Sequence, residues 1–215
     1  MGGVSVLGVD LAGVETRPTG LCALRGTWAR TWTVRRDEEV VEAARRWRAE
    51  LVAIDAPLSL PRGRRSLEER SPHHLRACDR ALLERGIRFF PVTLGPMRAL
   101  TARGMRLREG LEREGFEVIE VYPGGAQDVL GIPRKGAGRV ALLEGLRGLG
   151  LEGLGPGASD HELDAATAAL VGALFLAGLC EGLGEPGEGV IVMPKAGLTR
   201  EVVRGALLSI GRRSA

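Results

Sequence analysis

Hydrophobic positions recur with two different periods along this chain, and the period predicts where strands and helices lie. Short apolar or alternating runs are typical of strands, whereas apolar positions three or four residues apart are typical of helices. Strands are predicted at 4–10, 20–25, 28–34, 51–55, 117–122 and 190–193. Helices are predicted at 38–50, 73–85, 97–114, 124–130, 139–148, 159–180 and 199–210. The first half is therefore a three-stranded meander, a helix and a further strand.

Local signals support several of these elements. An Arg-Gly pair between the second and third strands suits a hairpin, and the continuously apolar run 51–55 is typical of a strand that is buried on both faces. The helix at 159–180 begins with Ser159 and Glu162, the spacing of a capping box. Its small residues, such as Ala165 and Ala169, would allow close packing on a sheet. Gly182, Gly184 and Pro186 are expected to end it.

Composition limits the class of protein. A chain of 215 residues that is 44% hydrophobic can bury one sizeable core. No run is apolar for long enough to span a bilayer, so we expect no membrane association. The N-terminus lacks a signal-peptide pattern. The three cysteines are widely spaced and odd in number, which favours a reducing, cytoplasmic location over a disulfide framework or zinc site.

The charge balance is compatible with a nucleic-acid partner but does not require one. The formal net charge is +3, and Lys135 and Lys195 are the only lysines among 30 cationic residues. This arginine bias, with abundant Gly, Ala and Leu, is typical of a GC-rich genome, and a thermophilic source is one interpretation. Aromatic residues make up only 4% of the chain, which gives no support to a base-stacking platform of the single-strand-binding kind.

Four carboxylates stand at the ends of apolar runs or just inside a helix. Asp10, Asp55 and Glu120 follow predicted strands, and Asp164 lies one turn into the helix at 159–180. A charge at the end of a buried strand costs free energy unless it has a partner, a metal ion or a wet cleft. We therefore predict that the four acids converge on one site.

Clustered Asp and Glu side chains are the ligands that Mg²⁺ and Mn²⁺ prefer. Enzymes that cut nucleic acids commonly hold two such ions about 3.5–4 Å apart. The prediction is therefore a Mg²⁺ or Mn²⁺ site formed by Asp10, Asp55, Glu120 and Asp164. Structural roles stay open: Asp10 could begin a turn, Asp55 could cap the turn at Ala-Pro, and Glu120 could be a solvated strand-end charge.

Four further residues are candidates for substrate contact or proton transfer. His161 lies three residues before Asp164 and is a candidate acid/base or ligand, or a hydrogen-bonded structural residue. Arg76 and Arg80 share one side of a predicted helix with Asp79 and are candidate phosphate contacts, or members of an intrahelical ion pair. Lys135 is a candidate for neutralising phosphate charge, or it faces water.

Five short motifs occur in order along the chain: Gly8-Val-Asp-Leu-Ala12, Ile54-Asp-Ala-Pro-Leu58, Arg76-Ala-Cys-Asp-Arg80, Glu120-Val-Tyr-Pro-Gly124 and His161-Glu-Leu-Asp-Ala165. Together they resemble a bacterial and archaeal family of unknown function, numbered 429, described as predicted nucleases of ribonuclease-H-like fold. The last motif also resembles the final acidic motif of Holliday-junction resolvases of that fold.

The resemblance implies an α/β fold: a ribonuclease-H-like mixed sheet, with an antiparallel meander and parallel strands, flanked by helices. It places Asp10 on the first strand and Asp164 on the last helix of the site, and leaves Asp55 and Glu120 as alternatives for the middle acid. We expect one domain over residues 1–215 with a mainly helical insertion at about 60–115.

The sequence thus predicts a metal-dependent nuclease that hydrolyses phosphodiester bonds. Two alternatives stay open. One is a nucleotide-dependent phosphotransferase of the actin/hexokinase-like group, whose first strand also ends in an acidic, glycine-containing turn, although this chain is short for its two-lobed architecture. The other is a non-catalytic nucleic-acid-binding protein. The choice of DNA or RNA, endonuclease or exonuclease action, and the oligomeric state are not determined by the sequence.

Overall fold

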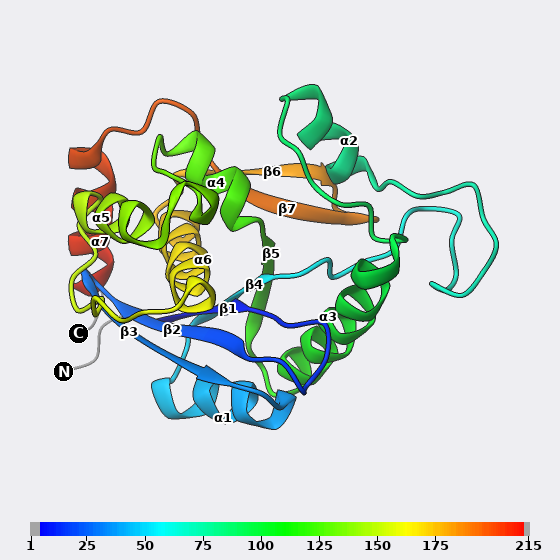
Figure 1. Cartoon of the computed structure of the whole chain (residues 1–215), viewed down its shortest axis with the longest axis horizontal. Coiled ribbons are helices and arrows are strands. Elements are labelled where there is room, and N and C mark those ends of the chain that lie inside the picture. Colours follow the sequence, from blue (N-terminus) through cyan, green and yellow to red (C-terminus); the bar gives the residue numbers. More distant parts are fainter. Residues whose placement is uncertain (1–4, 213–215) are drawn as a thin grey trace.

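A seven-stranded mixed sheet with helices on both faces forms the centre of the computed structural model, which describes residues 5–212 (Figure 1). The strands are β1 (Ser5–Asp10), β2 (Thr19–Arg25), β3 (Trp28–Val34), β4 (Leu51–Asp55), β5 (Glu117–Val121), β6 (Cys180–Glu185) and β7 (Gly189–Pro194). The α-helices are α1 (Asp37–Trp47), α2 (Ala77–Glu84), α3 (Gly95–Arg113), α4 (Pro123–Val129), α5 (Arg139–Gly148), α6 (Asp160–Leu176) and α7 (Arg200–Gly211), and Lys135–Ala137 form a 3₁₀ turn.

The strand order is β3-β2-β1-β4-β5-β7-β6. β1, β2 and β3 form an antiparallel meander, β1, β4, β5 and β7 pair in parallel, and β6 returns antiparallel to β7. This arrangement confirms the predicted α/β class, a ribonuclease-H-like mixed sheet flanked by helices. No helix in the described part of the chain is long and apolar enough to cross a membrane.

Alternation along the strands divides the core into two layers. On β1, Val6 packs in the cluster that contains α5, α6 and α7, whereas Leu7 and Val9 pack in the cluster with α1 and α3. The same alternation holds on β4, where Ala53 lies in the α6 layer and Ile54 in the layer of α1 and α3. Side chains of successive strand residues point to opposite faces, so an acid's position in its strand decides which layer it joins.

α6 packs unusually close to the first two strands because these strands carry glycines beneath it. A Cβ atom on Gly8 would overlap the carbonyl oxygen of Ala165, and one on Gly20 would overlap the carbonyl oxygen of His161. The small residues of α6 that the sequence suggested for close packing are buried there, including Ala165 and Ala169. This contact brings the N-terminal turns of α6 over the ends of β1 and β2.

The segment between β4 and β5 carries α2 and α3, which pack over different strands on the same face of the sheet, opposite α6. α3 packs with α1 below β1 and β4, through Leu107 and Leu111. α2 packs instead on β6 and β7, where Cys78 and Leu82 contact Leu183. In Figure 1 the long connection before α2 extends away from the sheet at the right of the view.

The predicted elements were mostly found, with one clear error. Residues 177–180 were expected to continue the helix, but α6 ends at Leu176, and Gly178 (φ +73°) adopts the left-handed conformation that commonly ends a helix. The glycines taken as helix terminators belong to strand β6, whose Gly-rich sequence lacks the apolar alternation of a strand. Val4, predicted to begin the first strand, lies outside the described residues.

Candidate active site

The first two predicted acids meet at one edge of the sheet. Asp10 is the last residue of β1, Asp55 is the last residue of β4, and the parallel pairing places them opposite one another. Each follows a residue of the α1 and α3 layer, Val9 or Ile54, so the side chains of Asp10 and Asp55 project toward α6. Neighbouring strands lie about 4.8 Å apart. Two carboxylates therefore share one cleft.

The third acid comes from above, on α6. Ser159 accepts a hydrogen bond from the backbone amide of Glu162, and the Glu162 carboxylate accepts one from the backbone of Ser159, which completes the predicted capping box and fixes the start of this helix. Asp164 follows within the second turn and is only 3% exposed. Gln127 of α4 donates to Asp164 Oδ1 at 2.9 Å, and Lys135 Nζ donates to its Oδ2 at 2.7 Å.

His161 connects α6 to the end of β1. Its Nδ1 lies 2.6 Å from Asp10 Oδ2, and its side chain is 45% exposed. The hydrogen bond that Asp10 accepts from the ring, together with that residue's charge, raises the pKa of His161 above its ordinary value, because these effects outweigh burial. The ring is thus oriented by Asp10, and Nε2 is its second nitrogen, the one that Asp10 does not engage.

Asp55 is the least compensated acid of the three. No hydrogen bond to its carboxylate is found among the described residues. Burial, and then the negative charges of Asp10 and Asp164, raise the pKa of Asp55 well above its ordinary value, while Lys135 opposes the shift. Burial lowers the pKa of Lys135 in turn, but its hydrogen bond and charge interaction with Asp164 outweigh burial and raise it. Three acids therefore share one lysine and one histidine.

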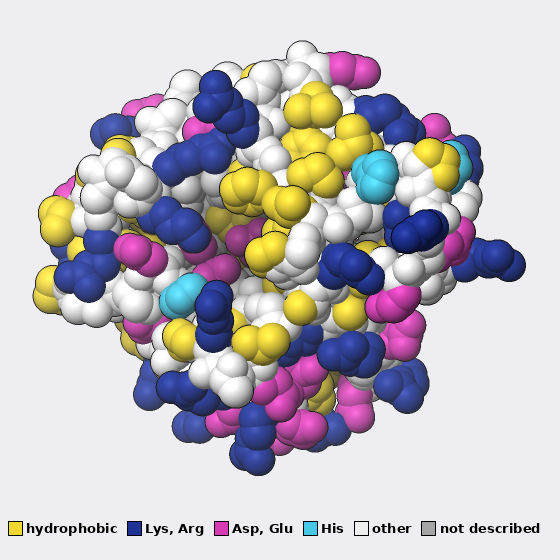
Figure 2. Space-filling view, turned by 45° about the vertical axis from the view of Figure 1, so that its right-hand side comes forward, with side chains coloured by type: hydrophobic (Ala, Val, Ile, Leu, Met, Phe, Trp, Pro, Cys, Tyr) yellow, Lys and Arg dark blue, Asp and Glu magenta, His cyan; other side chains and the backbone are white. Residues whose placement is uncertain are grey.

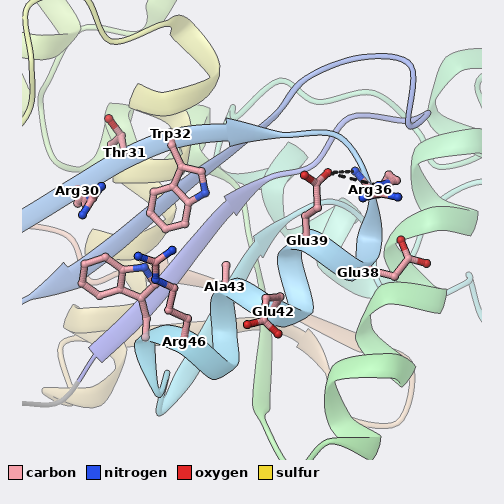
Figure 3. A pocket seen from close by; sticks show the side chains of 10 residues that line it. Arg30, Thr31, Trp32, Arg36, Glu38, Glu39, Glu42, Ala43 and Arg46 are labelled. Carbon is pink, nitrogen blue, oxygen red and sulfur yellow. Dashed lines mark hydrogen bonds and ion pairs between the residues drawn. The ribbon is translucent and has the colours of Figure 1, made fainter.

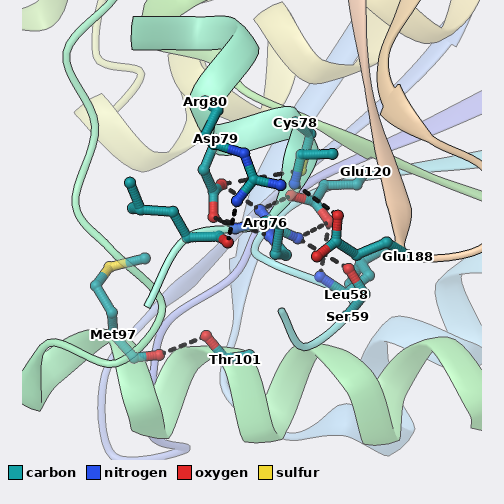
Figure 4. Close-up of polar contacts among 12 residues, drawn as sticks. Leu58, Ser59, Arg76, Cys78, Asp79, Arg80, Met97, Thr101, Glu120 and Glu188 are labelled. Atoms are coloured by element: carbon teal, nitrogen blue, oxygen red, sulfur yellow. Dashed lines mark hydrogen bonds and ion pairs between the residues drawn. The ribbon is translucent and has the colours of Figure 1, made fainter. Parts of the chain in front are cut away.

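Glu120 and Arg76 bind each other and do not join this cluster. The sequence predicted Glu120 as a metal ligand and Arg76 as a phosphate contact, so the structure differs from that prediction. Arg76 donates to both Glu120 oxygens, at 2.8 and 2.7 Å, and the backbone amide of Leu58 donates to the same carboxylate (Figure 4). Asp79 and the Ser59 hydroxyl accept the remaining guanidinium hydrogen bonds. All five N–H donors of Arg76 are used, and the residue is 1% exposed.

The register of the sheet explains why Glu120 is separate. Glu120 pairs with Ile54, not with Asp55, and alternates with Ile119 and Val121, which face α6. Its side chain therefore projects toward the opposite face from Asp10 and Asp55. Arg80, the other predicted phosphate contact, is exposed and donates to the Leu75 carbonyl oxygen; its role stays a prediction.

The donor chemistry of the cleft fits a divalent cation. Asp10, Asp55 and Asp164 offer the hard oxygen ligands that Mg²⁺ and Mn²⁺ prefer. The raised pKa of Asp55 reflects burial first and then repulsion from the other two acids, which a cation would relieve. Within residues 5–212, no three His, Cys, Asp or Glu side chains are already grouped around a single point as ligands. Lys135 supplies the positive charge beside Asp164 in this arrangement.

Sequence reasoning missed Gln127. This buried amide also donates to the Thr167 hydroxyl at 3.1 Å, so it fixes α4 to α6 and holds Asp164 in one orientation. Its only sequence signal is a polar residue within a short helix whose other inward positions, such as Ala126, are apolar.

A larger cavity lies away from this cleft. It has a volume of about 620 Å³ and lies between the edge strand β3 and α1 (Figure 3). Trp32 and Trp47 stack there with ring centroids 6.1 Å apart, and Arg25 lies over the Trp47 ring. Of its acidic residues, Glu39 takes part in the capping box of α1 and Glu42 pairs with Arg45. This cavity lacks the acids of the cleft, so it is not part of the candidate active site.

The fold and the acidic cleft together define an α/β protein of ribonuclease-H-like type with carboxylates at the strand ends. Residues 8–188 match the model of the family "protein of unknown function (DUF429)", and the chain belongs to this family. No match is found among curated protein sequences.

Two solved structures of RuvC from Thermus thermophilus are similar to this chain. One, in complex with a Holliday junction substrate, has 16% identity and a TM-score of 0.49, and the other has 17% identity and a TM-score of 0.47. Each comparison covers 81% of this chain and 96% of the RuvC chain.

Proposed function

We propose that this protein is a divalent-metal-dependent nuclease that hydrolyses phosphodiester bonds in nucleic acid. The observation that carries the proposal is the meeting of Asp10 and Asp55 in register at the ends of parallel strands, with Asp164 held over them by α6. Carboxylates arranged in this way suit Mg²⁺ or Mn²⁺, and Glu120 is left out because Arg76 neutralises it.

Each residue of the cleft has a distinct task in this proposal. Asp10, Asp55 and Asp164 would hold the cation, which supplies activated water and stabilises charge on phosphate oxygens. Lys135 keeps its ammonium charge, since its pKa is raised, and it can neutralise a phosphate oxygen when it leaves Asp164. His161 is oriented through Nδ1 by Asp10, so its Nε2 is the atom that would hold or release a proton.

The test compares Asp10→Asn and Asp55→Asn with Asp160→Asn, the same change at an exposed position in the first turn of α6. Mn²⁺ binding is measured by calorimetry, and cleavage is measured on single-stranded, duplex and branched DNA and RNA. The proposal predicts that the two site variants fold but lose metal binding and cleavage, whereas Asp160→Asn retains both. Cleavage by Asp10→Asn at the wild-type rate would reject the mechanism.

The same assays address the alternative functions. Saturable ATP binding without cleavage of any nucleic acid would favour a phosphotransferase. Binding of nucleic acid that is unaffected by Mn²⁺ and by Asp55→Asn would favour a non-catalytic binding protein. In either case the three acids would serve folding, and their replacement would change stability alone.

A further inference from the structure

A second cavity opens beside the acidic cleft and has a different chemical character. Its volume is about 280 Å³, and Asp55 and Lys135 form part of its wall. The rest of the wall is largely apolar and includes Phe89, Phe90 and Tyr122. The chain has eight aromatic residues, so three of them gather at this one cavity. Figure 2 shows acidic side chains within a hollow and hydrophobic side chains along one side of it.

The aromatic wall is held in place by the fold. Tyr122 stands at the end of β5, and its hydroxyl donates to the Arg88 carbonyl oxygen at 2.6 Å, which fixes the ring to the loop that carries Phe89 and Phe90. The Arg134 guanidinium lies over the Tyr122 ring, 5.9 Å from its centroid. Phe89 packs on the cluster formed by α2, β6 and β7. The wall is thus built from two distant segments.

Phe90 is the exposed member of this wall. Its side chain is 68% exposed, although it is large and apolar. Met97, at the start of α3, contributes a polarisable thioether to the same cavity. An exposed aromatic ring at the mouth of a cavity is suited to stacking on a flat ligand, because stacking needs one free ring face.

Size and charge restrict the ligand. A cavity of about 280 Å³ is at the lower end of the range for small-ligand sites, so it suits one flat ring and not a stacked base pair. The five guanidinium donors of Arg76 at its floor are already used. Recognition would therefore depend on stacking more than on hydrogen bonds. Lys135 lies where the ligand's anionic end could reach it.

We propose that this cavity binds one unpaired nucleobase of the nucleic-acid strand whose phosphate enters the cleft at Asp55 and Lys135. The inference rests on the proposed nuclease function and narrows its substrate class to nucleic acids with at least one unstacked nucleotide. A base within a duplex must leave its stack to reach such a pocket, and an already unpaired base does so at lower cost. Recognition by stacking is tolerant of base identity.

The low aromatic content gave no support to a base-stacking platform of the single-strand-binding kind, whereas the structure gathers three of the eight aromatic residues at this cavity. Composition counts aromatic residues but does not show where they lie. Phe89 and Phe90 are adjacent in the connection between two helices, and Tyr122 is more than 30 positions further along the chain. The rings meet at one wall because Tyr122 bonds to that connection and because Phe89 and Tyr122 pack on the same apolar cluster.

The test measures how much one base contributes to binding. A fluorescent duplex with a single bulged nucleotide is compared by anisotropy with the same duplex carrying an abasic residue at the bulge, in DNA and in RNA. Ca²⁺ replaces Mg²⁺ so that the measurement reports binding and does not depend on cleavage. The wild-type protein is expected to bind the intact bulge about tenfold more tightly than the abasic one, a difference typical of one stacked base.

Phe90→Ala should bring the ratio of affinities for the intact and the abasic bulge close to one. Phe90→Tyr, which keeps the ring, should retain the wild-type ratio. The matched control is Leu208→Ala, which also shortens an exposed apolar side chain but lies on α7. A ratio near one in the wild-type protein, or an unchanged ratio in Phe90→Ala, would overturn the proposal. A nucleoside monophosphate that competes as well as the bulged duplex would overturn the assignment to a base within a strand.

These results are distinguishable from failure of the nuclease proposal. A base-dependent ratio in a protein that cleaves no nucleic acid would support the pocket and reject the nuclease. Cleavage of nucleic acid without a base-dependent affinity ratio would support the nuclease and reject the base pocket.

Discussion

Arg76→Met should destabilise the protein severely, because Arg76 contacts two buried carboxylates, Glu120 and Asp79. Its five hydrogen bonds go to Glu120, Asp79 and Ser59, and its side chain is almost inaccessible. Methionine keeps the length of the side chain but leaves the carboxylates without a counter-charge. Removing one partner of a buried ion pair typically costs about 3–5 kcal/mol.

Urea unfolding measures this cost as a lower midpoint with an unchanged slope. For a chain of this length, each kcal/mol corresponds to about 2–4 °C in melting temperature, so the melting temperature should fall by roughly 6–20 °C. The matched control is Arg85→Met. Arg85 also pairs with a glutamate through two hydrogen bonds, at 2.7 and 2.9 Å to Glu181, but both side chains are substantially exposed. Its loss should cost no more than about 1 kcal/mol.

Glu120→Gln separates the structural role of Glu120 from the ligand role that the sequence suggested. Arg76 keeps Asp79 in this variant, so the cost should be smaller than for Arg76→Met, and cleavage should persist at a temperature where the variant is folded. Equal destabilisation by Arg76→Met and Arg85→Met would refute the buried-pair reasoning. Loss of metal binding in a stable Glu120→Gln protein would return Glu120 to the metal site.

Two further predictions concern the cleft and the helix above it. The folded-state pKa of Asp55 is above its ordinary value of 3.8, because burial and then the charges of Asp10 and Asp164 disfavour the ionised carboxylate. This cost to folding is absent below pH 3.8, grows as pH rises and is complete above the raised pKa. Asp55→Asn should therefore raise the free energy of unfolding in EDTA at neutral pH, with a gain that disappears toward pH 3.8 in urea titrations, and a pH-independent effect would contradict the reasoning. Gly8→Ala should lower the free energy of unfolding by at least about 1–3 kcal/mol in the same assay, because the added Cβ would overlap the backbone at Ala165. Gly110→Ala, at an open position within α3, is the control and should stabilise the protein by about 0.5–1 kcal/mol. A loss of stability at both positions would contradict the packing argument.

The sequence predicted the convergence of Asp10 and Asp55 because the information is local. Each acid ends an apolar run, and two parallel strands bring their carboxyl ends to the same edge of a sheet. The start of α6 could also be predicted, from the capping-box spacing of Ser159 and Glu162. These signals depend on neighbours within a few residues, and the structure agrees with them.

The sequence could not separate Asp55 from Glu120 as the middle acid. Both residues follow four apolar or alternating positions, and both are followed by a proline two or three residues later. The difference arises from a one-residue offset between β4 and β5, which turns Glu120 to the other face. It also depends on Arg76, which is 44 positions away in the chain. Neither the register nor a distant partner is visible in a single sequence.

The buried acids differ in how much positive charge lies beside them, and this difference supports the hypothesis of a metal site. The fold gives Glu120 and Asp79 a guanidinium with five donors and thereby compensates their burial. At the neighbouring strand ends, Asp10, Asp55 and Asp164 receive one lysine and a half-exposed histidine, although an arginine would fit a purely structural role better. A site that is left short of positive charge costs stability, and such a cost is typical of functional sites. The missing charge is what a divalent cation would supply.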